Sequence, residues 1–314
     1  MNTDVRNFRL LYGCMGLGGD WDDSPYGPRE IEEAEAAVVA ALDAGITAFD
    51  HADIYRRGKS EAVFGEVLAR TPGLRERVVL QSKCGIRLPD GGHPGHYDLR
   101  GPHIVRSVEK SLTRLRTDVL DVLLLHRPDP LVDPDEIAEA FGSLHEQGLV
   151  RQFGVSNMSA AQIAHLQSRL DQPLVVNQLE MSLHKRNWVE AEVLVNTTTA
   201  TGFPLGTVQY CVSERIRVQA WGALAQGRFT GRAETEAEGK ATRMLVELAE
   251  AKRTTPEAVL LWWLQGHPAR VAPVVGTTRP ERIGACADAV RREPELTHEE
   301  WYRLWVTARG AALP

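Results

Sequence analysis

Side chains able to move protons stand at the ends of short apolar runs in this 314-residue chain. Asp50 and Tyr55 follow one such run. Lys83 ends the next run, and His126 follows a third. An ammonium group lowers the pKa of a nearby phenol by favouring the phenolate, and a buried ammonium needs a carboxylate partner. Asp50, Lys83 and Tyr55 could therefore form a proton relay.

His126 adds a group that could hydrogen-bond a carbonyl oxygen, orient a substrate or share in proton delivery. Each of these residues alone has a structural explanation, such as helix capping, a surface charge or a satisfied core histidine. Their joint occurrence at successive strand ends favours a shared site.

Eight short apolar runs must position these side chains, and each is rich in Val, Ile and Leu, which is typical of strands buried in a parallel sheet. The runs are residues 10–15, 46–49, 78–80, 119–125, 152–155, 174–176, 216–220 and 271–275. Most are followed by amphipathic stretches, which predict crossover helices. Examples are residues 60–68, 103–115, 134–145, 160–170 and 240–251.

This alternation predicts an α/β protein with a (β/α)8 barrel, in which the C-terminal strand ends meet at one mouth. The length suits a single domain over residues 1–314, with long loops at 87–101 and 183–215 over the mouth. A helical piece is expected at 187–195. The competing fold is an open doubly wound sheet, but a G-x-G-x-x-G fingerprint started at Gly16 fails at Trp21.

Composition excludes several classes of partner. Lys and Arg total 36 against 42 Asp and Glu, a net charge of −6, which gives no basic footprint for nucleic acid. No apolar run approaches 18 residues, so no membrane partner is expected. The four cysteines show no C-x-x-C spacing, and no metal site is expected. We expect a cytoplasmic protein, and the sequence does not indicate its oligomeric state.

Six motifs, in order along the chain, resemble signatures of the aldo/keto reductase family. They are Asp50-His-Ala-Asp-Ile-Tyr55, Gln81-Ser-Lys83, Leu125-His126-Arg-Pro-Asp, Gly154-Val-Ser-Asn157, Val176-Asn-Gln178 and Pro273-Val-Val-Gly-Thr-Thr. The resemblance covers roughly residues 8 to 310. It implies a barrel enzyme that uses NADPH, with NADH possible, to reduce an aldehyde or ketone to an alcohol by hydride transfer. Asp50, Tyr55, Lys83 and His126 match the family's catalytic residues, with Tyr55 as proton donor.

The same resemblance implies a cofactor site made by the later strand ends. Ser156, Asn157 and Gln178 could hold a carboxamide, and Trp221 stands where family members stack an aromatic ring on the nicotinamide. Two guanidinium groups beside hydroxyls would favour a 2′-phosphate and hence NADPH. The further positions implied are Gly222, Leu224, Gly276, Thr277, Thr278, Arg279 and Arg282. Each also has a structural explanation, such as strand-end capping, core packing or a solvated charge.

The chain departs from the family pattern at three kinds of position. Gly276 stands where many members carry Lys, and Ala285-Cys286 stands where Glu-Asn is common. Arg56 replaces a usual Gly, and the 183–215 segment departs from the common helix. Pocket walls are expected from Trp21, Arg56, the 87–101 loop and Trp188.

Two alternatives of other classes stay open at this point. One is a nucleotide-sensing regulatory subunit on the same fold. The other is a metal-dependent barrel hydrolase, for which His51 and Asp53 could begin a metal site.

Overall fold

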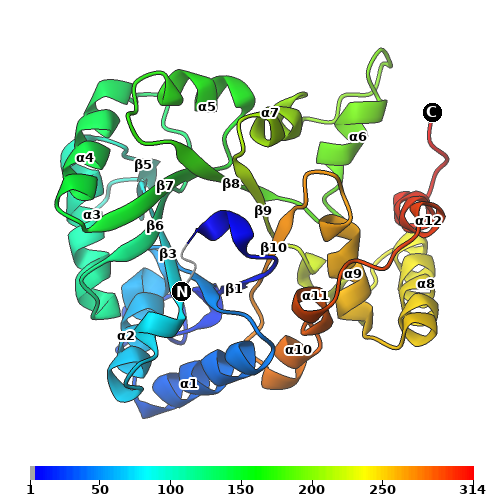
Figure 1. Ribbon diagram of the computed structural model, residues 1–314, viewed down its shortest axis with the longest axis horizontal. Helices are drawn as coiled ribbons and strands as arrows, with labels where there is room; N and C mark the ends of the chain where they lie inside the picture. Colours follow the sequence, from blue (N-terminus) through cyan, green and yellow to red (C-terminus); the bar gives the residue numbers. More distant parts are fainter. Residues whose placement is uncertain (1–3) are drawn as a thin grey trace.

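A closed barrel of eight parallel strands forms the centre of the computed structural model, which describes residues 4–314 (Figure 1). Around the barrel the strands follow the order β1-β10-β9-β8-β7-β6-β3-β2. Their bounds are β1 Leu11–Gly13, β2 Ala48–Asp50, β3 Val79–Cys84, β6 Leu120–Leu125, β7 Val150–Ser156, β8 Leu174–Glu180, β9 Arg217–Trp221 and β10 Ala272–Val275. Each strand overlaps one of the apolar runs, and the predicted barrel is confirmed.

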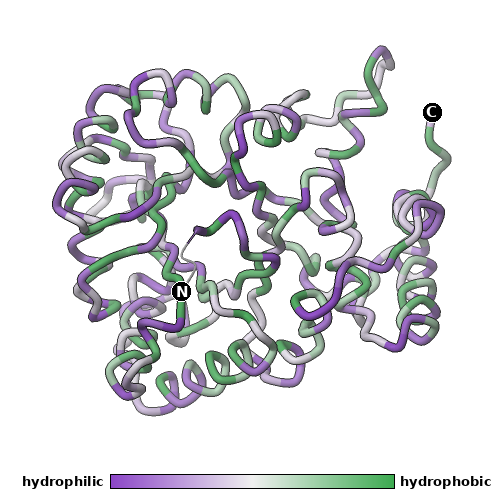
Figure 2. Tube along the Cα trace, in the orientation of Figure 1, coloured by the Kyte–Doolittle hydropathy of each residue, from purple (hydrophilic) through white to green (hydrophobic). Residues whose placement is uncertain are grey.

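Helices surround the barrel because each presents an apolar face to it. They are α1 Pro28–Asp43, α2 Lys59–Arg70, α3 Gly101–Leu115, α4 Pro134–Glu146, α5 Ala160–Gln167, α6 Asn187–Val193, α7 Thr207–Ser213, α8 Glu236–Lys252, α9 Pro256–Gln265, α10 Pro280–Gly284, α11 Asp288–Arg291 and α12 His298–Arg309. Figure 2 shows hydrophilic and hydrophobic residues alternating along helices such as α1. Within residues 4–314, no helix has both the length and the apolar character that crossing a membrane requires.

The N-terminal segment closes one end of the barrel. The backbone N–H of Val5 donates to Gln152 Oε1 at 3.3 Å, and the Arg217 guanidinium donates to the carbonyl oxygen of Phe8 at 3.1 Å. Both partners lie near the N-terminal ends of their strands, β7 and β9. The Phe8 ring packs against two apolar clusters, which consist of strand residues and Val5. In Figure 1 this segment, coloured blue, crosses the middle of the ring of strands. The open mouth is therefore at the C-terminal strand ends.

The two long segments have more regular structure than expected. The 87–101 segment includes an antiparallel hairpin of β4 (Ile86–Arg87) and β5 (His96–Tyr97). The 183–215 segment forms α6, which agrees with the helix predicted over 187–195, and α7, which was not predicted. Trp188, at the start of α6, is buried with its ring 5.7 Å from that of Trp263 and 4.9 Å from that of His267. The prediction that Trp188 lines a pocket is therefore wrong, because α6 packs it against α9.

Helices α2 and α3 approach so closely at Gly65 that a side chain would not fit. A Cβ atom at Gly65 would overlap the carbonyl oxygen of Arg114 on α3. We expect Gly65→Ala to lower the free energy of unfolding by roughly 1–3 kcal/mol, because α2 and α3 must move apart. Urea denaturation followed by circular dichroism measures the change.

Gly142→Ala in α4 is the matched control, because a Cβ there meets no atom within 4 Å. Alanine favours a helix over glycine, so this variant should be as stable as the wild type or up to about 1 kcal/mol more stable. Equal stability of the two variants would contradict the close approach of α2 and α3.

Candidate active site

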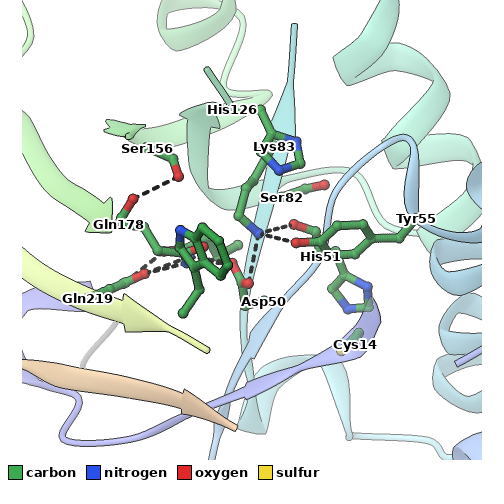
Figure 3. A network of polar contacts seen from close by, with 12 residues as sticks. Cys14, Asp50, His51, Tyr55, Ser82, Lys83, His126, Ser156, Gln178 and Gln219 are labelled. Atoms are coloured by element: carbon green, nitrogen blue, oxygen red, sulfur yellow. Dashed lines mark hydrogen bonds and ion pairs between the residues drawn. The ribbon is translucent and has the colours of Figure 1, made fainter. Parts of the chain in front are cut away.

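A buried ammonium group joins three of the residues singled out by the sequence (Figure 3). Lys83 Nζ donates to Asp50 Oδ2 at 2.7 Å, to the carbonyl oxygen of His51 at 2.8 Å and to the phenol oxygen of Tyr55 at 3.2 Å. The Lys83 side chain is only 1% exposed. All three donor positions of the ammonium are therefore used, and Tyr55 is one of the partners.

Strand register and a tight turn bring these groups together. Asp50, the last residue of β2, lies beside Gln81 of β3, and Lys83 follows two residues later on the same face of that strand. Tyr55 begins the 3-10 helix η3 (Tyr55–Gly58), in which Arg56 and Arg57 have φ angles of 50° and 58°. This left-handed turn, unusual for non-glycine residues, folds the chain back directly after Tyr55.

A layer of glutamines holds the other oxygen of Asp50. Asp50 Oδ1 accepts from Gln81 Nε2 at 2.6 Å and from Gln178 Nε2 at 3.1 Å. Both amide nitrogens also donate to Gln219 Oε1, each at 2.9 Å, and Gln219 donates back to Gln81 at 3.0 Å. Each Asp50 oxygen is thus hydrogen-bonded.

No functional role was predicted from the sequence for Gln81 or Gln219. Each interrupts a run of apolar strand residues, and a buried polar residue in such a run needs a partner. Strand register pairs Asp50 with Gln81 and Gln178 with Gln219. Their position as polar residues inside apolar strands could therefore have assigned both glutamines to the site.

Burial and charge set opposing pKa shifts at this cluster. Burial alone would lower the pKa of Lys83, but Asp50 and Tyr55 outweigh it and raise that pKa, so the ammonium stays charged. Burial raises the pKa of Tyr55 by more than Lys83 lowers it. The lowering of the Tyr55 pKa by Lys83 that the sequence indicated is present, but desolvation of the phenol outweighs it. At neutral pH the phenol keeps its proton.

His126 lies next to Tyr55, with the two rings 5.9 Å apart and nearly perpendicular. Its backbone N–H donates to the carbonyl oxygen of Cys84 at 2.9 Å, which continues the β3–β6 pairing. Burial, aided by the positive charges of Lys83 and Arg127, holds the pKa of His126 well below its usual value. The imidazole is therefore neutral at neutral pH and can donate one N–H.

A cavity of about 600 Å³ opens above these groups at the C-terminal strand ends. The predicted residues that line it are Asp50, Tyr55, His126, Ser156, Asn157, Gln178, Trp221, Gly222, Leu224, Gly276, Thr277, Arg279 and Arg282. Lys83 and Thr278 are not among its lining residues. Lys83 is covered by its partners, and the Thr278 methyl group lies against Gly16. Trp21 also lines the cavity, as expected.

Ser156, Asn157 and Trp221 form a chain of hydrogen bonds along the cavity wall. Trp221 Nε1 donates to Asn157 Oδ1 at 3.0 Å, which fixes the indole ring at the end of β9. Asn157 Nδ2 donates to Ser156 Oγ at 2.8 Å and to the carbonyl oxygen of His126 at 3.1 Å. Ser156 Oγ in turn donates to the carbonyl oxygen of Gln178 at 2.8 Å. These side chains therefore position one another.

The arginines around the cavity differ in how they are paired. Arg282 donates to Thr230 Oγ1 at 2.8 Å and pairs with Glu257 at 3.2 Å. Arg279 makes no ion pair with any residue in 4–314. Arg127 and Arg232 also line the cavity and were not singled out by the sequence analysis. Arg127 could have been predicted to line the cavity, because it directly follows His126 in the sequence.

His51 points away from the cavity into the apolar layer. Its ring packs edge-on against Phe64, with ring centres 4.6 Å apart, and burial lowers its pKa to about 3. Among residues 4–314, no group of three or more His, Cys, Asp or Glu side chains is arranged to hold a metal ion.

Comparisons with known proteins agree with this architecture. The aldo/keto reductase family model matches residues 9–305. The oxidoreductase YcsN of Bacillus subtilis is 37% identical, over 99% of this chain and 97% of that protein. The 6-dehydroglucose reductase of Agrobacterium fabrum is 37% identical, over 96% of this chain and 94% of the relative.

A solved structure is also similar. It is an aldo/keto reductase from Klebsiella pneumoniae in complex with NADP and acetate, with a TM-score of 0.72 at 26% identity, covering 98% of this chain and 92% of that one. The family match spans the whole barrel together with the residues gathered at its mouth. The chain therefore belongs to the aldo/keto reductase family of oxidoreductases.

Proposed function

We propose that this protein reduces aldehyde or ketone carbonyls to alcohols with NADPH, and that Tyr55 delivers the proton. One observation carries the proposal: Lys83 Nζ lies within hydrogen-bond distance of both Asp50 and Tyr55, at the base of a cavity that His126 also lines. This arrangement supplies a positioned proton donor and a fixed positive charge to a carbonyl oxygen.

The residues around the cavity fit a nicotinamide cofactor. A reduced nicotinamide, when bound, supplies a hydride to the carbonyl carbon. Ser156 and Asn157 offer hydroxyl and amide groups to a carboxamide, and the Trp221 ring, held by Asn157, offers a flat apolar face to an aromatic ring. The volume of about 600 Å³ falls in the range of small-molecule sites.

Proton delivery follows from the protonation states of the cluster. Tyr55 keeps its proton at neutral pH, so it can donate O–H to the carbonyl oxygen as negative charge develops there. The phenolate left behind is stabilised by the Lys83 ammonium, whose charge Asp50 maintains. His126, being neutral, donates an N–H to the same oxygen and orients the substrate.

Preference for NADPH rests mainly on Arg279. Its guanidinium has no carboxylate partner among residues 4–314, whereas Arg282 already pairs with Glu257. An unpaired guanidinium can donate two N–H groups to the 2′-phosphate of NADPH. NADH has no 2′-phosphate and cannot make this interaction.

A hydroxylated aldehyde is the first substrate to assay. The Agrobacterium relative is named a 6-dehydroglucose reductase, and the two proteins are similar over nearly their full lengths. The Arg127 guanidinium lies 5.9 Å from the centre of the Trp221 ring and faces the cavity beside His126. It can donate hydrogen bonds to sugar hydroxyls, so we propose a sugar-derived aldehyde as the substrate class.

Replacing Tyr55 with Phe tests the catalytic assignment. The variant loses the donated proton and should lose about 100-fold or more in kcat, because general acid catalysis commonly contributes that much. NADPH oxidation with 6-dehydroglucose and a panel of simple aldehydes gives the rate. NADPH affinity, followed by quenching of tryptophan fluorescence, should change little.

Tyr302→Phe in α12 is the matched control and should keep the wild-type rate. If Tyr55→Phe lost NADPH binding as well as activity, the proposal that Tyr55 donates the proton without binding the cofactor would be contradicted. Steady turnover by the wild type also separates a reductase from a nucleotide sensor, which would bind NADPH and turn over poorly.

Replacing Arg279 with Ala tests the cofactor preference. We expect the KM for NADPH to rise about tenfold or more while that for NADH changes little, because one charge-assisted interaction with the 2′-phosphate is lost. In Arg282→Ala the KM values for NADPH and NADH should change by more similar amounts, because Arg282 is already paired with Glu257. Equal changes in both KM values for Arg279→Ala would contradict the assignment.

A further inference from the structure

A second cavity of about 570 Å³ lies behind the loop that carries Tyr55. Ile54 lines both this cavity and the first one, so the two are separated by a single stretch of chain. Its walls come from η3, the hairpin segment 86–90 and the exposed side of α3. The lining residues with polar or charged side chains are Asp23, Asp53, Arg57, Arg87, Asp90, His103, Arg106, Ser107, Lys110 and Arg114.

Positive charge dominates this cavity, although the whole chain carries a net charge of −6. Five of its lining residues are Arg or Lys, and three are Asp. Arg106 and Lys110, one helical turn apart on α3, make no ion pair with any residue in 4–314. Their two charges are therefore available to a ligand.

The other cations are paired to different degrees. Arg57 lies 3.5 Å from Asp23, and Arg87 lies 3.6 Å from Asp98, both longer than a charge-assisted hydrogen bond. The Arg57–Asp23 pair is exposed, so it contributes little to stability and can exchange partners at small cost. Asp98 is buried and also pairs with Arg100 at 2.8 Å, so it keeps a partner when Arg87 turns to a ligand. Arg114 is held more firmly by Glu61 at 3.2 Å and is a wall of the cavity rather than a free ligand.

Asp53 connects the cavity to the catalytic loop. Its backbone N–H donates to the carbonyl oxygen of Lys83 at 2.9 Å, and its own carbonyl oxygen accepts from Arg114 at 3.0 Å. The Oδ1 atom is buried and has no hydrogen-bond partner among residues 4–314. The cavity thus combines a carboxyl group, two residues before Tyr55, with exposed cations on α3.

We propose that this second cavity is a binding site for a small dianion, a phosphorylated molecule or a chemically similar one, held mainly by Arg106 and Lys110. Arg57 and Arg87 join them by exchanging their long ion pairs for the ligand. A hydroxyl group of the ligand can donate to the Asp53 carboxyl. None of these residues belongs to the reductive chemistry proposed above, so the site is separate from the carbonyl and cofactor positions.

Protonation of Asp53 should govern how strongly the dianion binds. Burial, followed by the negative charge of Glu61, raises the pKa of Asp53 to about 7, against the opposing effects of Ser107 and Arg114. Above pH 7 the ionised carboxylate repels a dianion, and below pH 7 the neutral carboxyl group does not. Burial and the surrounding cations lower the pKa of His103, against the opposing negative charge of Asp98. Affinity should therefore rise as the pH falls.

Calorimetric titration of pyrophosphate into the full-length protein tests the site, with ionic strength held constant by sodium chloride. We expect saturable binding that weakens about tenfold or more in the double variant Arg106→Ala/Lys110→Ala, because two charge-assisted contacts are lost. The matched control, Arg70→Ala/Arg77→Ala, removes two exposed arginines elsewhere and should bind as the wild type does. The pyrophosphate binding that depends on Arg106 and Lys110 should persist in Arg279→Ala.

Three results would overturn the proposal. They are absence of binding to the wild type, equal weakening in both double variants, and loss of binding in Arg279→Ala, which would move the pyrophosphate to the cofactor position. The titration does not involve turnover, so failure here is distinguishable from failure of the reductase assignment.

Sulfate tests the role of Asp53, because the charge of the sulfate ion is constant between pH 6 and 8. The wild type should bind sulfate about threefold or more tightly at pH 6 than at pH 8. Asp53→Asn, which is neutral at every pH, should lose most of this difference and bind tightly at pH 8. An unchanged pH dependence in Asp53→Asn would refute the proposed role of the carboxyl group.

Discussion

The buried ion pair of Lys83 and Asp50 is the interaction on which the mouth of the barrel depends. An unpaired charge in this position would cost several kcal/mol, so each partner requires the other. The ammonium then fixes Tyr55 and the carbonyl group of His51, while the carboxylate organises the glutamines of β3, β8 and β9. A single pair of charges thereby sets the positions of side chains from four strands.

The remaining features of the mouth arrange themselves around that pair. His126 is kept neutral partly by the charge of Lys83, and Tyr55 is kept protonated by burial despite it. Asn157 links the His126 carbonyl oxygen to the Trp221 ring, so the part of the cavity wall at the end of β9 is tied to the part at the end of β6. Geometry of this kind needs no large movement before reaction, because its donors are already oriented.

The sequence was most informative where periodicity and chemistry agreed. Apolar runs of strand length predicted the barrel, and Asp50, Lys83 and Tyr55 meet as their strand-end positions suggested. The sequence could not predict the direction of the Tyr55 pKa shift, because that direction depends on how strongly the folded chain desolvates the phenol. Trp188 was misplaced for a similar reason: its contact with Trp263 comes from the path of α6, which no local pattern specifies. The pairing of Arg282 with Glu257 likewise joins residues from different helices.

Closure of one end of the barrel by Phe8 and its neighbours has a kinetic consequence. If the protein acts as proposed, both reactants would enter and both products would leave through the mouth at the other end. Two molecules that share one entrance cannot exchange independently, because whichever lies deeper is trapped beneath the other. Steady-state kinetics should accordingly follow a compulsory order, with the deeper molecule first to enter and last to leave.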